Sequence, residues 1–175
     1  VELALKVSPR EKWYSDWWTE LRSAAAEGGV KLIDRHLDRS GMLALMNAAD
    51  AYISLHRSEG VGLTMAESML LGKPTIATGY SGNLDFMTPD NSYLVNFERT
   101  AIETDTPPYP KGFIWAEPSV EHAAELMRRV VENPAEARAI AARGKADAGR
   151  LFAPLAAGQK MADRLAAIAR ERGRR

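Results

Sequence analysis

Hydrophobic residues along the chain fall into short runs that alternate with longer amphipathic stretches. The short runs predict strands at 2–7, 30–33, 51–55, 75–77, 93–95 and 112–115. Apolar residues at helical spacing predict helices at 12–26 and 42–49, and another that ends before Gly72 and Pro74. Strands that alternate with helices are typical of an α/β fold with a parallel sheet. We therefore predict this fold class.

The last third of the chain predicts helices. Ser119 is a predicted N-cap for a helix that ends at residue 132, and residues 133–136 have the sequence of a capping box with proline at its first helical position. Pro154 predicts the start of a final helix. Before these helices, residues 98–111 contain three prolines and predict a long surface loop.

A nine-residue segment from Glu59 to Glu67, with the sequence EGVGLTMAE, carries the clearest chemical signal. It places a glycine-rich turn between a predicted strand and a helix, with one carboxylate at each end. Backbone N–H groups at a helix start point outward, and the helix dipole favours an anion there. We therefore predict a phosphate site, with carboxylates beside it that accept hydrogen bonds from hydroxyl groups. A phosphate that approaches the backbone closely leaves no room for a Cβ at Gly60 and Gly62. We also predict a positive φ at these two glycines.

The same segment resembles the E-x7-E motif of retaining glycosyltransferases with the GT-B fold, in the large family 4 group. The resemblance is strong over about residues 30–95 and weaker beyond, and it is carried by SLHRSEGVGLTMAE at 54–67 and LGKPTIATGYSGN at 71–83. Val61 stands where an aromatic residue is more usual in that group. The resemblance implies a Rossmann-like parallel sheet flanked by helices, one half of a GT-B fold, with C-terminal helices.

The resemblance also implies roles for individual residues. Glu59 is the expected catalytic residue, in contact with the donor sugar, and Glu67 is expected to bind the ribose hydroxyls. The expected donor- and nucleotide-binding residues are Gly60, Val61, Gly62, Leu63, Thr64, Glu67, Asp34 and Arg35. Three further candidates are His56, Gly82 and Asn83. The alternatives are structural: an acidic helix start capped by Thr64, a solvated loop after the second strand, and a hydrogen-bonded histidine.

Composition limits the class of protein. With 175 residues, 46% apolar and 26% charged, the chain has the size of one globular domain, which we predict to span 1–175. Basic and acidic residues number 23 each, which argues against a nucleic-acid partner. The absence of cysteine excludes thiolate metal sites and suits the cytoplasm. No apolar run reaches the roughly 20 residues of a membrane span, so peripheral association with the inner membrane is the alternative for the full-length protein.

The function that the resemblance implies is transfer of a sugar from a nucleotide-diphosphate sugar to an acceptor, either a sugar or a lipid-linked glycan, in polysaccharide biosynthesis. The departing diphosphate would help to deprotonate the acceptor in a front-face displacement. Backbone amides and basic side chains would neutralise its charge, so no metal ion or cofactor is expected. The chain starts directly in a strand, and the resemblance implies that an N-terminal acceptor domain is missing. The fragment alone is therefore expected to be inactive. Two alternatives stay open, a sugar-nucleotide epimerase and a non-catalytic nucleotide-sugar-binding module.

Overall fold

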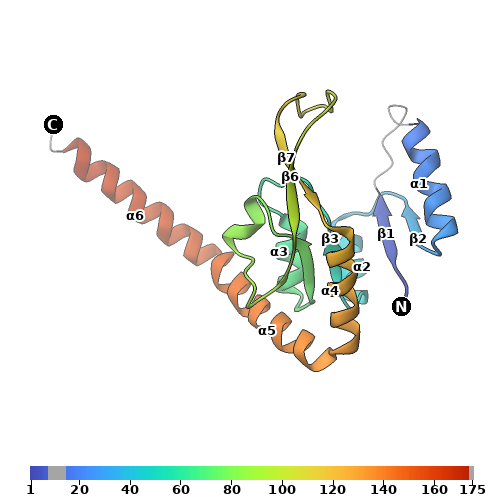
Figure 1. Cartoon of the computed structure of the whole chain (residues 1–175). Coiled ribbons are helices and arrows are strands. Elements are labelled where there is room, and N and C mark those ends of the chain that lie inside the picture. The colour runs from blue at the N-terminus through green and yellow to red at the C-terminus, as the bar shows by residue number, and fades with distance from the viewer. Residues whose placement is uncertain (8–14, 174–175) are drawn as a thin grey trace. The chain divides into compact units, whose positions relative to one another are not determined.

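The computed structural model describes residues 1–7 and 15–173 (Figure 1). They form two compact units, Val1–Ala44 and Leu45–Arg175. The first unit contains, in chain order, β1 (Ala4–Val7), α1 (Ser15–Glu27) and β2 (Lys31–Asp34), and α2 (Arg39–Ala48) continues from it into the second. The two strands pair in parallel, as a strand–helix–strand unit requires. Residues 12–14 of the predicted first helix lie outside the described part of the chain.

Helix α2 begins at an aspartate cap. Oδ1 of Asp38 accepts hydrogen bonds from the N–H of Gly41 at 2.7 Å and from the hydroxyl of Ser40 at 2.9 Å. These two bonds, the backbone one first, lower the pKa of the Asp38 carboxyl because they favour its charged form. The cap thus fixes the residue at which the chain turns from the β2 loop into the helix.

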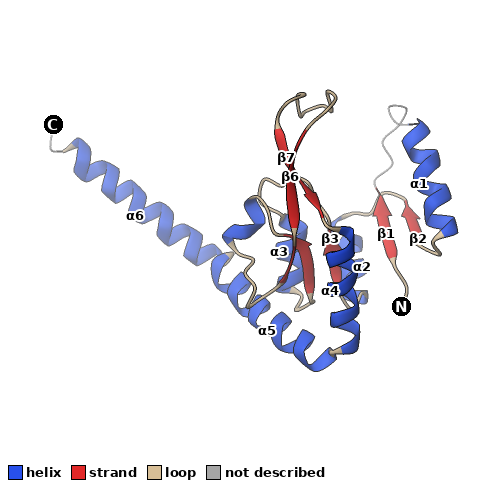
Figure 2. Ribbon diagram, in the orientation of Figure 1, coloured by secondary structure: helices blue, strands red, loops and turns tan. Residues whose placement is uncertain are grey.

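The second unit is built on a three-stranded parallel sheet with the order β3–β4–β5 (Figure 2). Its elements in chain order are β3 (Tyr52–Ser54), α3 (Leu63–Leu70), β4 (Thr75–Thr78), the short 3-10 helix η1 (Gly82–Asp85), β5 (Tyr93–Val95), β6 (Phe97–Ala101), β7 (Ile114–Pro118), α4 (Val120–Glu132), α5 (Pro134–Leu151) and α6 (Pro154–Arg172). Parallel strands with flanking helices confirm the predicted α/β class. The helix end predicted at Gly72 is also confirmed, since this residue has φ 74°.

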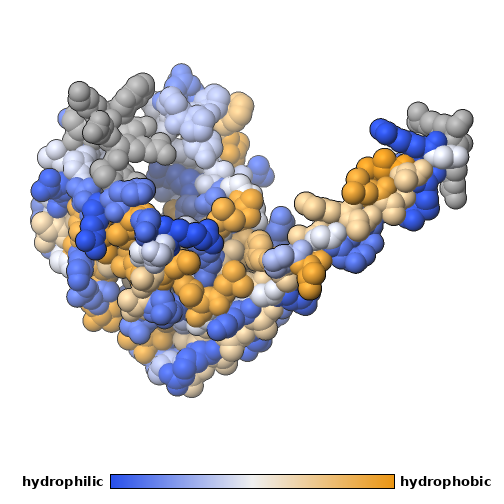
Figure 3. Space-filling model, turned by 180° about the vertical axis from the view of Figure 1, so that it is seen from behind, coloured by the Kyte–Doolittle hydropathy of each residue, from blue (hydrophilic) through white to orange (hydrophobic). Residues whose placement is uncertain are grey.

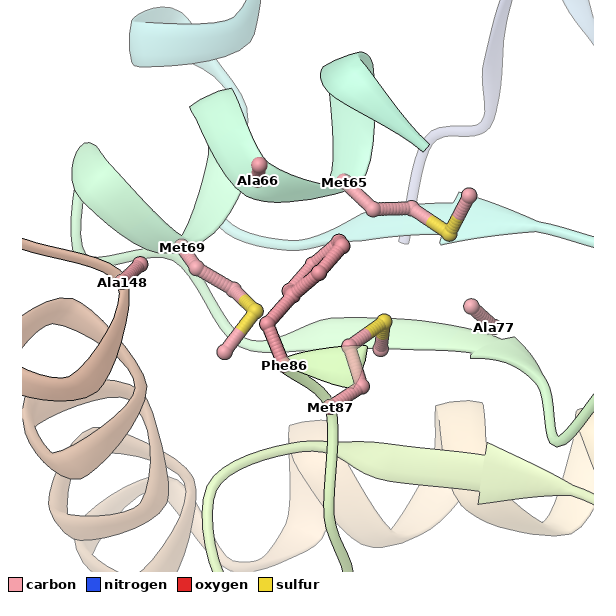
Figure 4. Packing of buried hydrophobic residues seen from close by; sticks show 7 residues of the cluster. All are labelled: Met65, Ala66, Met69, Ala77, Phe86, Met87 and Ala148. Carbon is pink, nitrogen blue, oxygen red and sulfur yellow. The ribbon is translucent and has the colours of Figure 1, made fainter. Parts of the chain in front are cut away.

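The middle strand, β4, has both of its faces covered. All four of its residues are buried, and successive side chains point to opposite faces. Ala77 packs in one cluster with Met65 of α3, beside Phe86 and Met87 (Figure 4). Ile76 packs in a second cluster on the other face, with Tyr93, Val95, Ala123, Leu126 and Ile140. With both faces filled, the loops at the carboxyl ends of the strands are where this sheet can bind a ligand.

Strand β6 corrects the predicted loop at 98–111. Residues Phe97–Ala101 form an antiparallel hairpin with β7, with Phe97 opposite Pro118. Most of β6 is exposed and polar, so it lacks the apolar alternation that identifies a strand. Pairing with β7 supplies its backbone hydrogen bonds, and the three prolines lie in the connection between the two strands.

Of the caps predicted for α4 and α5, only the one at the start of α4 is found in the structure. Oγ of Ser119 accepts a hydrogen bond at 3.1 Å from a backbone N–H in the first turn of α4, as predicted. The predicted capping box at the start of α5 is wrong. The side chain of Asn133 donates to the carbonyl of Arg129 at 3.1 Å, and Glu136 pairs with the Arg129 guanidinium. An ion pair between the two helices has therefore replaced the local cap.

Helix α6 contains no buried residue. Figure 3 shows hydrophobic side chains along it, and Leu155, Met161 and Leu165 are among the most exposed apolar residues of the structure. Within the described residues, no helix combines the length and the hydrophobicity that a membrane span requires.

Candidate functional site

The turn between β3 and α3 has the geometry of an anion site. Gly62 is the N-cap residue of α3, with φ 85° and ψ 48°, a left-handed conformation that favours glycine. No side chain in the described part of the chain caps this helix, so its first N–H groups, at Leu63 and Thr64, are left for an external acceptor. Such N–H groups and the helix dipole both attract an anion. The predicted positive φ at Gly62 is confirmed.

The second glycine of the turn, Gly60, does not have the positive φ predicted for it, while the close approach of a phosphate to it stays a prediction. A Cβ on Gly60 would meet no described atom within 4 Å, and its φ lies outside the left-handed region. Close approach occurs instead at Gly82, where a Cβ would lie 2.1 Å from the carbonyl oxygen of Gly60. Gly82 therefore lets two loops pack backbone against backbone.

The loop after β4 holds the backbone of Glu59. The hydroxyl of Ser81 donates to the carbonyl of Glu59 at 2.7 Å and accepts from its N–H at 3.3 Å. The N–H of Gly82 donates to the same carbonyl at 3.1 Å. The glycine turn at the end of β3 and the loop at the end of β4 thus form one hydrogen-bonded structure.

Ser81 makes these contacts from a strained backbone. Its φ of 82° and ψ of −154° lie in a region that is essentially restricted to glycine. Strained residues of this kind persist where the surrounding structure fixes them, and they are frequent at functional sites. At Ser81 the strain accompanies the two hydrogen bonds of the hydroxyl to Glu59.

We expect Ser81→Ala to be less stable than Ser81→Gly by about 1–2 kcal/mol, because both variants lose the hydroxyl but only glycine relieves the strain. Urea unfolding of the two variants measures the difference. Equal free energies of unfolding would show that the backbone at this position is not strained.

The hydroxyl of Tyr52 reaches the start of α3 from β3, where it donates to Oγ1 of Thr64 at 2.9 Å. Burial raises the pKa of the Tyr52 phenol, and the charges of Glu59 and Glu67 act in the same direction, against the hydrogen bond to Thr64. Tyr52 was missed in the sequence because it belongs to an apolar run that predicts a buried strand. The cap of α3 is Gly62 and not Thr64.

Two of the further candidates, His56 and Asn83, bind each other and the β4 loop. Nε2 of His56 lies 2.9 Å from the carbonyl oxygen of Tyr80 and 3.2 Å from Oδ1 of Asn83. Both neighbours are acceptors, so Nε2 carries the proton. Asn83 is fully buried, and its Nδ2 donates to the carbonyl of Thr78 at 3.0 Å. The geometry favours the structural alternative for His56, Asn83 is likewise held by hydrogen bonds, and ligand contact by either side chain stays a prediction.

Most predicted site residues belong to the second unit, in its two connected loops and in the first turns of α3. These are Glu59, Gly60, Val61, Gly62, Leu63, Thr64 and Glu67, with His56, Gly82 and Asn83 on neighbouring positions. Asp34 is the last residue of β2 and Arg35 follows it, and both are exposed. They belong to the first unit, so their part in the site stays a prediction.

Comparison with protein families identifies the chain. Residues 26–147 match the model of the glycosyl transferases group 1 family. The chain belongs to this family. The match confirms the resemblance carried by residues 54–67 and 71–83. A comparison with curated proteins gives no match.

Solved glycosyltransferase structures share the fold of this group 1 chain. HepE from Anabaena, crystallised with UDP and glucose, is 20% identical with a TM-score of 0.71, over 95% of this chain and 40% of that one. Sucrose-phosphate synthase from Thermosynechococcus elongatus is 18% identical with a TM-score of 0.70, over 97% and 39%. The C-terminal domain of LpcC from Francisella tularensis is 20% identical with a TM-score of 0.60, over 79% and 63%. The chain thus spans less than half the length of the first two, as one half of a GT-B fold would.

Proposed function

We propose that the second unit binds a nucleotide-diphosphate sugar, and that the full-length protein is a retaining glycosyltransferase. The observation that carries this proposal is the uncapped N-terminus of α3 at the left-handed Gly62, between Glu59 and Glu67. Membership of the group 1 family supports a sugar-transfer reaction. The complexes of Anabaena HepE with UDP and with UDP-glucose support a sugar nucleotide as the ligand.

In this proposal the diphosphate lies against the N–H groups of Leu63 and Thr64, which no described side chain caps. Glu67, one turn further along α3, accepts hydrogen bonds from the ribose hydroxyls. Glu59, on the other side of the turn, faces the donor sugar. The acceptor binds to an N-terminal domain of the same protein.

The proposed reaction is a displacement on one face of the sugar. The bond between the anomeric carbon and the diphosphate oxygen breaks, and the acceptor oxygen bonds to the anomeric carbon on the same face. The proton of the acceptor hydroxyl passes to the departing diphosphate. Backbone N–H groups and the dipole of α3 stabilise the negative charge that develops on the diphosphate. The reaction as proposed uses no metal ion, because these groups supply the neutralisation.

We expect Glu67→Ala to weaken binding of the preferred nucleoside diphosphate by roughly 1.5–3 kcal/mol, the scale of hydrogen bonds to a charged group. Titration calorimetry of the full-length protein with UDP, GDP and ADP measures the affinity and identifies the base.

Glu125→Ala is the matched control, because Glu125 is an exposed helical glutamate of α4. It should leave the affinity unchanged. If the protein bound none of the three nucleotides, the proposed ligand would be wrong. If it bound one and Glu67→Ala bound it equally well, the ribose role of Glu67 would have to be given up.

A further inference from the structure

An arginine two residues before Glu59 ties the glycine turn to the β6–β7 hairpin. The guanidinium of Arg57 donates to both carboxylate oxygens of Glu117, from Nε at 2.7 Å and from Nη2 at 2.9 Å. It also lies over the ring of Trp115, 4.8 Å from the ring centre. The carbonyl of Arg57 accepts a hydrogen bond from the buried N–H of Ala116 at 2.9 Å. We call Arg57, Trp115 and Glu117 the Arg57 clasp.

The Arg57 clasp is better suited to fixing geometry than to stabilising the fold. The side chains of Arg57 and Glu117 are 50% and 45% exposed, and exposed ion pairs contribute little to stability. A two-point hydrogen bond to a carboxylate and a flat contact with an indole nevertheless define one orientation of the guanidinium. The clasp therefore holds the guanidinium in place, and the hydrogen bond from Ala116 holds the backbone of residue 57.

Glu59 lies between the clasp and the β4 loop. On one side, the backbone is fixed at Arg57 by the hairpin. On the other side, Ser81 and Gly82 bind the N–H and the carbonyl of Glu59 itself. No hydrogen bond to the Glu59 carboxylate is found among the described residues. The position of this carboxylate thus depends on how its backbone is held.

We propose that Arg57 is a positioning residue, which acts through the clasp to hold the Glu59 carboxylate in its reactive place beside the donor sugar. The β6–β7 hairpin extends past the sheet (Figure 1). Through the Arg57–Glu117 hydrogen bonds, the clasp couples this hairpin to the segment that carries Glu59. The inference rests on the proposed function. It assigns no direct contact with the ligand to Arg57.

The test compares Arg57→Lys with the unaltered full-length protein. Lysine keeps the charge but has neither the two-point hydrogen bond nor the flat contact with Trp115. We expect kcat for release of nucleoside diphosphate from UDP-, GDP- or ADP-glucose to fall about 10–100-fold, the scale of a small misplacement in an active site. The KM for the donor and the affinity for the nucleotide should stay unchanged. The melting temperature should fall by at most about 2–4 °C.

A charge swap tests the clasp from its other partner. Arg57→Glu alone should lower kcat further, because two carboxylates then face each other. Adding Glu117→Arg should restore part of kcat, because the ion pair forms again in the opposite sense. If Arg57→Glu lowered kcat only by destabilising the protein, kcat and the melting temperature would recover together in the double variant. Recovery of kcat without recovery of the melting temperature therefore supports the positioning role.

Arg129→Lys is the matched control. Among the described residues of the second unit, Arg129 forms the other ion pair in which one guanidinium contacts both oxygens of a glutamate, Glu136, on α5. This variant should leave kcat unchanged. An active protein whose Arg57→Lys variant keeps its kcat would overturn the positioning role alone. A protein that neither binds a nucleoside diphosphate nor releases one from any of the three donors would overturn the proposed function itself.

Discussion

Replacing Gly82 with alanine is expected to separate the two loops that carry the site. The new Cβ would lie 2.1 Å from the carbonyl oxygen and 2.6 Å from the carbonyl carbon of Gly60. Both atoms belong to the backbone, so no side chain can turn aside to make room. We expect a loss of about 2–3 kcal/mol in the free energy of unfolding, the upper part of the range for overpacking. Thermal unfolding should show a fall of about 4–12 °C in melting temperature.

The same substitution should also lower turnover, because the N–H of Gly82 holds the carbonyl of Glu59. Gly60→Ala is the matched control in the facing loop. A Cβ there would meet no described atom within 4 Å and needs no left-handed φ, so its effect on stability should be small. If the Gly82 and Gly60 variants melted at the same temperature, the close packing of the two loops would be refuted.

Local rules were sufficient for the elements on either side of the site. Short apolar runs identified the strands of the sheet, and glycines identified the turn before α3 and the end of α3. The left-handed conformation at Gly62 could be predicted because a strand has to turn into a helix within a few residues there. Gly60 shows the limit of this reasoning. Two glycines in one turn look alike in a sequence, but here one of them is needed for its φ and the other is not.

Contacts between distant segments could not be predicted from local patterns. The hydrogen bonds between Ser81 and Glu59 join residues 22 positions apart, and the Arg57–Glu117 pair joins residues 60 positions apart. Neither pair has a characteristic spacing, because loops that meet at a sheet edge can come from any strands. Strand β6 was missed for a related reason. Its exposed, polar sequence forms a strand only because β7 is available as a partner.

These contacts give the site a property that its motif alone does not contain. The helix start that attracts an anion and the glutamates beside it belong to one continuous segment. Their mutual position, however, depends on a loop from β4 and on a hairpin that follows β5. The chemistry is therefore local in sequence, whereas its geometry is determined by tertiary contacts. Substitutions at Arg57, outside the motif, should consequently change turnover more than they change stability.

The last prediction separates backbone strain from phosphate binding at Gly62. Gly62 and Gly72 both have left-handed backbones, with φ of 85° and 74°, so alanine should strain either position by about 1–2 kcal/mol. A Cβ on Gly62 would lie 2.7 Å from Cε of Met65, the mobile end of an adaptable side chain. On Gly72 it would lie 3.4 Å from Cδ of Lys145. Both variants should therefore fold and lose similar stability.

Only Gly62→Ala should also weaken nucleotide binding, because the turn must move while its N–H groups contact the diphosphate. We expect the affinity for the preferred nucleoside diphosphate to fall by about 1.5–3 kcal/mol, as for lost hydrogen bonds to a charged group. Calorimetry of the two full-length variants measures this difference at matched stability. Gly72→Ala lies at the opposite end of α3 and should bind the nucleotide as the unaltered protein does. Both variants carry a similar backbone strain, so strain alone cannot make their nucleotide affinities differ. If both variants bound the nucleotide equally well, the diphosphate would have to lie away from the start of α3.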